Sequence, residues 1–310
     1  MPLLLSEAEI KELLSMPDLI AAMEGALVAF SSGQVKQPVR TIFDVGTHGG
    51  FFGLMPSYVS TPSALGAKLV TVYHSNLERG LPSHLGIIVL LDPETGALMS
   101  VLDGRYITEA RTAAVSAVSV KKLARPDSRV LAILGSGVQA HSHVEAFAHV
   151  QKFDEIRAWS PTRSNLTMFA ASTGASPMDS AEAAVRGADV IVLVTASTDP
   201  VIDNAWVRDG AHVISVGACR PAQREMDPAL VLRSRLFVDS RVAAVKESGD
   251  VIGAGEGHIV AELGEAAATR TSAEEVTIFK SLGLAVEDVI AAHLAFTRAK
   301  ESGKGVSFDL

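Results

Sequence analysis

One short segment limits the possible folds of this chain more than any other. The apolar run Arg129–Leu134 leads directly into Gly135-Ser136-Gly137-Val138-Gln139-Ala140, and a helical pattern continues to Val150. This is the fingerprint G-x-G-x-x-A, placed between a strand and a helix as dinucleotide-binding domains place it. The segment therefore predicts the first strand, turn and helix of a Rossmann-type domain.

Each small residue of the fingerprint has a physical role. Gly135 permits the tight turn, Gly137 lets a pyrophosphate approach the backbone, and Ala140 allows close packing of helix on strand. The helix N-terminus adds backbone N–H groups and a positive dipole. The alternative is an ordinary strand-to-helix turn without a dinucleotide, since any glycine-rich turn can match the motif. The flanking strand and helix favour the dinucleotide site.

Strands and helices alternate after the break at Arg125-Pro126-Asp127, which is typical of a parallel sheet covered on both faces. The expected strands are 129–134, 155–160, 189–195, 212–217 and 236–239, and the expected helices are 138–150, 163–172 and 180–186. We also expect residues 276–300 to be helical and to return to the first domain.

The N-terminal part has a different pattern. Ser6 and Glu9 form a possible capping box for a first helix, and Pro17 begins a second one. Short strands are expected at 41–45, 65–73 and 86–91, followed by a long helix at 108–124. The predicted fold class is α/β, with a Rossmann-type doubly wound parallel sheet and a second, α+β domain.

Composition excludes several classes of protein. The chain has 310 residues, 48% of them hydrophobic, and a net charge of −8 from 27 Lys and Arg against 35 Asp and Glu. It is too apolar for disorder, and its acidity argues against nucleic acid or an anionic membrane as a partner. Cys219 is the single cysteine, so no intrachain disulfide or cysteine zinc cluster forms. Met1–Leu14 lacks a signal-peptide pattern, and we expect a cytoplasmic protein.

The end of the second strand of the predicted Rossmann sheet bears on the choice of cofactor. NAD enzymes carry an Asp or Glu there, which binds the ribose 2′-hydroxyl. This chain has Ser160, Pro161, Thr162 and Arg163 instead. Two hydroxyls and a guanidinium suit a 2′-phosphate, so NADP(H) is favoured and NAD(H) stays possible. The alternative interpretation is a helix cap at Ser160 with a solvated Arg163, and both can hold together.

Several further segments carry a family resemblance. They are Pro38–Thr41, Gly66–Thr71, Leu81–His84, Asp103–Thr108, Arg111–Ala114, Val238–Ser240 and Lys246–Asp250. In order and spacing they resemble the ornithine cyclodeaminase/mu-crystallin family from Leu4 to about Lys300, and within it the mu-crystallin-like ketimine reductase branch. The resemblance implies a substrate-binding and dimerisation domain at 1–120 plus about 290–310, a Rossmann domain at 121–289, and a homodimer.

The resemblance also implies roles for individual residues. Arg40 and Arg111 would bind a substrate carboxylate, and Lys68 would lie beside the reacting carbon–nitrogen bond as the catalytic residue. Substrate binding would also involve Glu247. The cofactor-binding residues would be Ser83, His84, Thr112, Gly135, Ser136, Gly137, Val138, Gln139, Ser160, Thr162, Arg163, Thr195, Val216 and Cys219.

The chemistry of these residue types agrees with the implied roles. Arginine is a bidentate partner for carboxylates, and alternation along 65–72 turns Lys68 away from the side of Leu69. Without the matched pattern, a lone lysine on a strand or an arginine opening a helix is more often solvated. His84 by itself is more often a structural histidine than a catalyst.

One position departs from the family pattern. Cys219, in Val216-Gly217-Ala218-Cys219, stands where ornithine cyclodeaminases carry an aspartate thought to act in deamination. Deamination requires a positioned acid or base, whereas an unperturbed thiol is mostly neutral near pH 7. Cys219 is alternatively a small buried apolar residue. The missing carboxylate argues against net deamination.

These observations rank several functions. The first is NAD(P)H-dependent reduction of a small cyclic imino acid, with an amino-acid dehydrogenase such as alanine dehydrogenase as a close variant. The second is an NAD-dependent ornithine or lysine cyclodeaminase, a lyase. The third is a dinucleotide-holding protein without turnover, as mu-crystallin is known to bind thyroid hormone, although Lys68 argues against it. No metal site is expected, because His141 and His143 face different sides of their helix.

Overall fold

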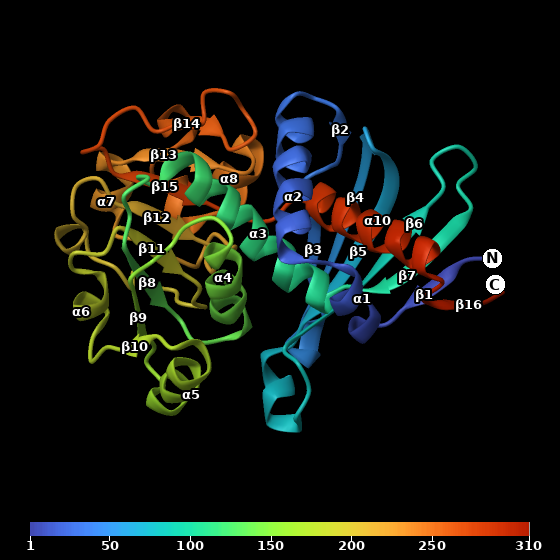
Figure 1. Cartoon of the computed structure of the whole chain (residues 1–310), viewed down its shortest axis with the longest axis horizontal. Helices are drawn as coiled ribbons and strands as arrows, with labels where there is room; N and C mark the ends of the chain where they lie inside the picture. The colour runs from blue at the N-terminus through green and yellow to red at the C-terminus, as the bar shows by residue number, and fades with distance from the viewer. Residues whose placement is uncertain (310) are drawn as a thin grey trace. The chain divides into compact units, whose positions relative to one another are not determined.

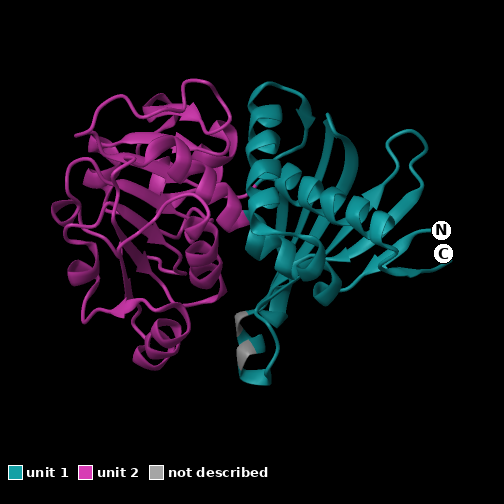
Figure 2. Cartoon of the chain, in the orientation of Figure 1, with its two compact units in different colours: residues 1–111, 284–310 teal, residues 112–283 magenta. Residues whose placement is uncertain are grey.

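The chain folds into two compact units in a computed structural model. The structure describes residues 1–309, without the side chains of His74 and Leu77. Unit 1 comprises Met1–Arg111 and Leu284–Leu310, and unit 2 comprises Thr112–Gly283 (Figure 2). Two distant parts of the chain thus build unit 1.

Unit 1 is built on a mostly antiparallel sheet. Its strand order is β16-β1-β7-β6-β5-β4-β2, with β3 paired on β4. The strands are β1 (Leu3–Leu5), β2 (Val35–Lys36), β3 (Thr41–Asp44), β4 (Phe51–Ser60), β5 (Ser63–Val72), β6 (His84–Leu91), β7 (Leu98–Asp103) and β16 (Val306–Ser307). Among the strand pairs that the described residues form in this sheet, only β1 and β7 run parallel.

Helices cover one face of this sheet. They are α1 (Glu7–Leu13), α2 (Met16–Ser31) and α10 (Ala285–Ser302), with the short helices η1 (Gly46–His48) and η2 (His74–Arg79) in loops. Ser6 and Glu9 make the expected reciprocal capping box at α1. The long helix α10 packs on β4, β5 and α2 (Figure 1), and its apolar residues form the core of the unit.

Unit 2 contains the predicted doubly wound sheet. Eight parallel strands run in the order β10-β9-β8-β11-β12-β15-β13-β14 (Figure 1). They are β8 (Val130–Leu134), β9 (Glu155–Trp159), β10 (Ser176–Pro177), β11 (Val190–Leu193), β12 (His212–Ser215), β13 (Arg235–Val238), β14 (Ile259–Glu262) and β15 (Thr277–Lys280). After β8 the chain forms β9 and β10 on one side of β8, and it then crosses to form β11 on the opposite side of β8. This reversal is where doubly wound sheets bind their ligands.

The helices of unit 2 follow the alternation expected from the sequence. They are α4 (Val138–Ala148), α5 (Arg163–Thr173), α6 (Ala181–Val185), α7 (Pro228–Arg233), α8 (Arg241–Glu247) and α9 (Gly249–Ile252), with η3 (Asn204–Trp206) and η4 (Glu256–His258). The four strands β8, β11, β12 and β15 are almost wholly buried. Because both faces of these strands are buried, their sequences are mostly continuous apolar runs.

The C-terminal tail corrects one expectation. Residues 276–300 are not one helix, because Thr277–Lys280 form β15 inside the parallel sheet and α10 begins only at Ala285. A buried run as short as Val276–Lys280 has no periodicity that separates strand from helix. Gly283, with a φ of +84°, then separates the two elements.

The division of the chain also differs in position from the expected one. It falls at Arg111–Thr112, inside the continuous helix α3 (Arg105–Leu123), rather than at 120–121. The second division falls at Gly283–Leu284 rather than at 289–290. A boundary within an unbroken helix leaves no turn residue for sequence reasoning to detect. The functional roles of the two units stay predictions.

Among the described residues, no single helix is long and apolar enough to cross a membrane. The pair α1 and α2 passes the test of length and composition only when taken together across an 87° bend.

Candidate active site

Lys68 is a buried cation in the sheet of unit 1. On β5 the alternate residues Ala64, Gly66 and Lys68 are buried, and Lys68 is only 2% exposed. Its Nζ lies 2.7 Å from Oδ2 of Asp288 and donates to Oγ1 of Thr108 at 3.3 Å. Strand alternation therefore turns this lysine to the buried face of the sheet, toward an acidic partner on α10.

Arg111 is bound by the same carboxylate from the other side. Its Nε donates to Oδ1 of Asp288 at 2.9 Å, and its Nη1 donates to Oε2 of Glu287 at 2.7 Å. All three side chains are buried. Asp288 thus bridges Lys68 and Arg111, with one oxygen atom directed to each cation.

The charges of this cluster favour an anionic ligand. Burial is the main cause that lowers the pKa of Lys68 from 10.5 to about 8, and Arg111 and Arg40 lower it further while Asp288 opposes the shift. The cations Arg40, Lys68 and Arg111 and the carboxylates Glu287 and Asp288 by themselves sum to a formal charge of 3 − 2 = +1, and Arg40 acts on Lys68 through its charge. A small carboxylate would neutralise this excess, and a lysine with a pKa near 8 can donate a proton near neutral pH.

The sequence did not single out the two acidic members of the cluster. Glu287 and Asp288 lie in the first turn of α10, where acidic residues are common because they stabilise the helix dipole. Because acidic residues are common at this position, their place in the helix does not mark these two as partners of Lys68 and Arg111. The signal that could reveal them is that both carboxylates lie within the otherwise apolar stretch 284–292, which leads into and begins the helix.

In unit 2 the fingerprint loop has room for a phosphate. Gly135 has a φ of +127°, and a Cβ there would lie 2.6 Å from the carbonyl oxygen of Val194. Gly137 caps α4 with extended backbone, and a Cβ placed there would meet no atom within 4 Å. Val138, the first helical residue, is exposed and Gln139 is half-buried. These residues therefore fit a pyrophosphate at an open helix N-terminus.

The neighbouring strand end brings the proposed ribose-binding residues to this loop. Ser136 donates from Oγ to Oγ of Ser160 at 3.0 Å, which joins the fingerprint to the end of β9. Thr162 is the N-cap of α5. Arg163 is exposed, and its Nη1 lies 3.3 Å from Oδ1 of Asp179. Hydroxyl and guanidinium groups stand where NAD enzymes carry a carboxylate.

The ends of β11 and β12 hold further predicted residues. Thr195 follows β11 and donates from its backbone N and Oγ1 to Oε1 of Glu225 at 2.6 and 2.8 Å. Cys219 donates from Sγ to the carbonyl oxygen of Val216 at 3.1 Å. Glu225, which accepts the two hydrogen bonds from Thr195, was not predicted from the sequence. It follows a loop without regular periodicity, so no pattern marks it.

The other predicted residues are divided between the units. Ser83 and His84 lie at the start of β6 in unit 1, where Ser83 Oγ is 3.1 Å from His84 Nδ1. His84 pairs with Val72 along β5, away from Lys68, whose partner on β6 is Ile88. The structure thus brings Lys68 and Arg111 together on Asp288, with Arg40 near enough to lower the pKa of Lys68, whereas Ser83 and His84 lie farther along the pair of strands β5 and β6. In unit 2, Thr112 is buried on α3 and Glu247 is half-buried at the end of α8.

The histidines of α4 serve structural contacts. His143 is buried and binds Ser116 Oγ through Nε2 at 2.9 Å, whereas His141 binds Ser172 Oγ at 3.0 Å. Burial lowers the pKa of His143 to about 4, so it is neutral near pH 7. In the described part of the chain, no three His, Cys, Asp or Glu residues are grouped to hold a metal ion.

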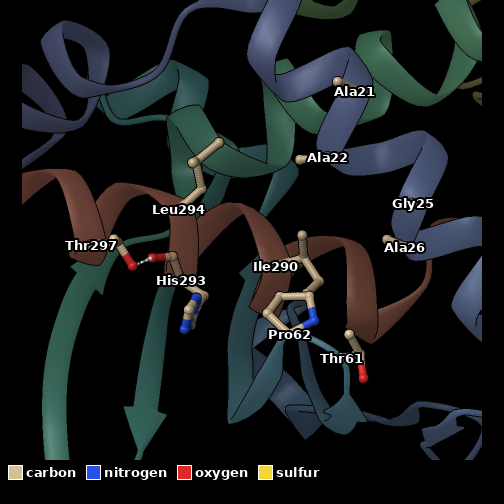
Figure 3. A pocket seen from close by; sticks show the side chains of 10 residues that line it. All are labelled: Ala21, Ala22, Gly25, Ala26, Thr61, Pro62, Ile290, His293, Leu294 and Thr297. Atoms are coloured by element: carbon tan, nitrogen blue, oxygen red, sulfur yellow. Dashed lines mark hydrogen bonds between the residues drawn. The ribbon is translucent and has the colours of Figure 1, made fainter.

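A separate hollow of about 350 Å³ lies in unit 1 (Figure 3). It is lined by small and apolar residues of α2, the turn between β4 and β5, and α10: Ala21, Ala22, Gly25, Ala26, Thr61, Pro62, Ile290, His293, Leu294 and Thr297. None of these is a predicted site residue. Helical periodicity places Ile290 and Leu294 on the face of α10 opposite Asp288, so the hollow is distinct from the Lys68 cluster.

Comparison with known proteins identifies the family of this chain. The family described as "Ornithine cyclodeaminase/mu-crystallin family" matches residues 1–303. The rat (Rattus norvegicus) ketimine reductase mu-crystallin is 47% identical over 303 residues, covering 95% of this chain and 96% of the relative. The chain belongs to the ornithine cyclodeaminase/mu-crystallin family.

Two solved structures resemble the whole chain. The Delta(1)-pyrroline-2-carboxylate reductase of Thermococcus litoralis, in complex with NADH and L-proline, has a TM-score of 0.94 at 38% identity, covering 99% of this chain and 100% of that one. An archaeal alanine dehydrogenase, a dimer with bound NAD, has a TM-score of 0.93 at 30% identity, covering 99% of both chains. The fold is that of nicotinamide-dependent enzymes.

Asp288→Asn tests the bridge between the two cations. We expect it to lower the free energy of unfolding by about 3–5 kcal/mol, because two buried cations lose a shared negative charge. Urea denaturation followed by circular dichroism measures the change. The exposed Asp309 provides the matched control Asp309→Asn, which should stay within about 0.5 kcal/mol of wild type. Equal stability of the two variants would contradict the bridging role.

Proposed function

We propose that this protein is an NAD(P)H-dependent reductase of a small cyclic imino acid, a ketimine reductase. The observation that carries the proposal is the buried Lys68–Asp288–Arg111 cluster beside Arg40, in a chain that also contains a dinucleotide-binding sheet. The cluster offers an excess positive charge for a carboxylate and a proton donor with a pKa near 8 for a nitrogen atom.

Each residue of the cluster has a defined task in this reaction. Arg40 and Arg111 bind the substrate carboxylate and orient the ring. Lys68 donates a hydrogen bond, and then a proton, to the imine nitrogen. Asp288 keeps Lys68 and Arg111 in place and charged. The nicotinamide, when bound, supplies the hydride to the imine carbon, so the C=N bond becomes an amine.

The similar proteins support this reaction over the alternatives. The rat relative is a ketimine reductase, and the Thermococcus litoralis reductase was solved with NADH and L-proline, the amino acid that reduction of pyrroline-2-carboxylate yields. Cyclodeamination would need an acid or base at position 219. Cys219 instead donates its thiol hydrogen to the carbonyl oxygen of Val216, which leaves it committed to the backbone.

An absorbance assay of the nicotinamide band tests the function. Purified protein is mixed with NADPH or NADH and pyrroline- or piperideine-2-carboxylate, and separately with NAD or NADP and ornithine, lysine, proline or alanine, with ammonia measured in parallel. Loss of NADPH with a cyclic imine, and no ammonia from ornithine, is expected. Ammonia and proline from ornithine without net cofactor change would establish the lyase instead, and activity confined to alanine would establish a dehydrogenase.

Lys68→Ala tests the proton donor. We expect imine reduction to fall by about 10²–10⁴-fold while the dissociation constant of NADPH stays near wild type, because the lysine acts on the substrate and not on the cofactor. In the wild type, kcat/KM should fall as the pH rises through about 8, since Lys68 loses its proton there. The exposed Lys152 gives the control Lys152→Ala, which should behave as wild type. Equal loss of cofactor binding in Lys68→Ala would show that the assignment is wrong.

We also propose that NADP(H) is the preferred cofactor. Ser160, Thr162 and Arg163 present two hydroxyls and a guanidinium beside the fingerprint, and no carboxylate occupies the end of β9. A 2′-phosphate would be repelled by a carboxylate and attracted by Arg163. NAD(H) stays the alternative, since two similar structures hold NADH or NAD.

Ser160→Asp tests the cofactor preference. A carboxylate at this position should lower the ratio of kcat/KM for NADPH to that for NADH by about tenfold or more, because it repels the 2′-phosphate and binds the 2′-hydroxyl. Steady-state kinetics with both cofactors measure the ratio. An unchanged ratio would show that Ser160 does not lie beside the 2′-position of the adenosine ribose.

We propose a homodimer formed by the open face of the unit 1 sheet. Leu54, Leu69 and Ile87 lie opposite one another in register on β4, β5 and β6, and Leu54 and Ile87 are 37% and 45% exposed. This apolar row lies on the sheet face opposite the buried Lys68, which faces α10. Contiguous exposed apolar surface is typical of an interface, and the similar alanine dehydrogenase is a dimer.

Ile87→Glu tests the dimer. We expect the wild type to have twice the chain mass of 32.5 kDa, and the variant to be a monomer, because a charge would have to be buried in the interface. Sedimentation equilibrium measures the mass. Leu232→Glu, on the exposed surface of α7, should remain a dimer. A monomeric wild type, or a dimeric Ile87→Glu, would contradict this interface.

A further inference from the structure

A second buried carboxylate lies in unit 2, at the carboxyl edge of the parallel sheet. Glu225 is fully buried in the segment between β12 and α7. Its Oε1 accepts hydrogen bonds from the backbone N and Oγ1 of Thr195, at 2.6 and 2.8 Å. Its Oε2 accepts from Gly217 N at 2.8 Å, Ala218 N at 3.2 Å and Ser215 Oγ at 2.9 Å. One side chain therefore joins the segments that follow β11 and β12.

Charged neighbours hold Glu225 in this position. Asp250 of α9 accepts through Oδ1 from the backbone N of Glu225 at 2.9 Å. Lys280, at the end of β15, lies 3.4 Å from Asp250 Oδ2 and donates to Ser215 Oγ at 2.9 Å. Burial raises the pKa of the Glu225 carboxyl, whereas Lys280 and the donors of Thr195 and Ser215 act against that rise. Five donors directed at its two oxygen atoms favour the ionised form.

The contact between the two segments is too close for another side chain. A Cβ built on Gly217 would lie 1.8 Å from the carbonyl oxygen of Thr195 and 2.5 Å from Oε1 of Glu225. The backbone at Gly217 thus touches the backbone at Thr195, and the carboxylate of Glu225 closes the remaining space. The carboxylate of Glu225 therefore joins the two segments beyond the paired residues of β11 and β12.

The topology indicates which part of a dinucleotide these segments face. The pyrophosphate binds at the fingerprint after β8, and the adenosine ribose binds at the end of the following strand, here β9. The nicotinamide half consequently extends to the opposite side of β8, over the ends of β11 and β12, which are adjacent in the sheet (Figure 1). Thr195 and Gly217 are the residues at those ends.

We infer that Glu225 is a positioning residue for the nicotinamide half of the cofactor, because its carboxylate sets the backbone at Thr195, Gly217 and Ala218. This inference rests on the nicotinamide dependence in the proposed function. It extends the site to a residue that touches neither substrate nor cofactor and acts through the backbone of residues that line the pocket.

Glu225→Gln is the sharpest change, because it keeps size and shape while removing the charge. A glutamine amide has one acceptor oxygen and one donor nitrogen, so either orientation directs an N–H₂ group at a backbone N–H of Thr195 or of Gly217 and Ala218. The two segments must then separate at one end. The control Glu182→Gln changes an exposed glutamate of α6 that pairs with Arg186.

The experiment compares two ligands by isothermal titration calorimetry: NADPH, and 2′-phospho-ADP-ribose, which lacks the nicotinamide. For Glu225→Gln we expect the dissociation constant of NADPH to rise by about 10- to 100-fold and that of 2′-phospho-ADP-ribose to stay within about twofold of wild type. Glu182→Gln should match wild type with both ligands. This selective loss would not follow from general destabilisation, which would weaken both ligands alike.

Two results would overturn the inference: unchanged binding of both ligands, or an equal loss for both. If Glu225→Gln does not fold, the same two dissociation constants are measured for Ser215→Ala. This variant removes the hydroxyl that donates to Glu225 and accepts from Lys280. The measurement is independent of turnover. If the wild type binds NADPH but reduces no imine, the proposed reaction is refuted and this inference still stands. If the wild type reduces the imine and Glu225→Gln weakens the binding of both ligands equally, this inference alone is refuted.

Discussion

The bridge made by Asp288 is the interaction on which the unit 1 site depends. A lysine and an arginine, both withdrawn from water, would repel each other in a medium of low polarity, and each would be costly to bury alone. Asp288 directs one oxygen atom to each of them and so makes their close approach possible. With Arg40 included, the cluster contains three cations and two carboxylates, and the role we propose for it is to bind an anion.

Glu225 plays a comparable part in unit 2, although its partners are mostly backbone groups. It collects donors from the ends of β11 and β12 and is held by Asp250, while Lys280 interacts with its charge. Each unit thus contains a buried carboxylate that organises groups from separate segments. In unit 1 the organised groups are the cations Lys68 and Arg111, and in unit 2 they are backbone segments at the ends of β11 and β12.

Local patterns in the sequence predicted much of this architecture. The fingerprint at Gly135–Ala140 and the alternation after it identified the parallel sheet, because strand, turn and helix each leave a short-range signature. Alternation along β5 also predicted that Lys68 and Leu69 point to opposite faces of the sheet, but not which face is buried. Strand β15 was mistaken for helix, since four buried residues show no period. The acidic partners of Lys68 and Arg111 stayed hidden because first-turn acids on a helix have an ordinary explanation.

The sequence by itself determined the fold class, the place of the dinucleotide fingerprint and the family resemblance, because each of them rests on short segments whose pattern is contiguous along the chain. Only the tertiary structure decided that Asp288 meets Lys68 and Arg111, and that Glu225 joins Thr195 to Gly217. These contacts link residues separated by as many as 220 positions (288 − 68), so no local periodicity encodes them. Packing of α10 on β5, and of β11 beside β12, creates them.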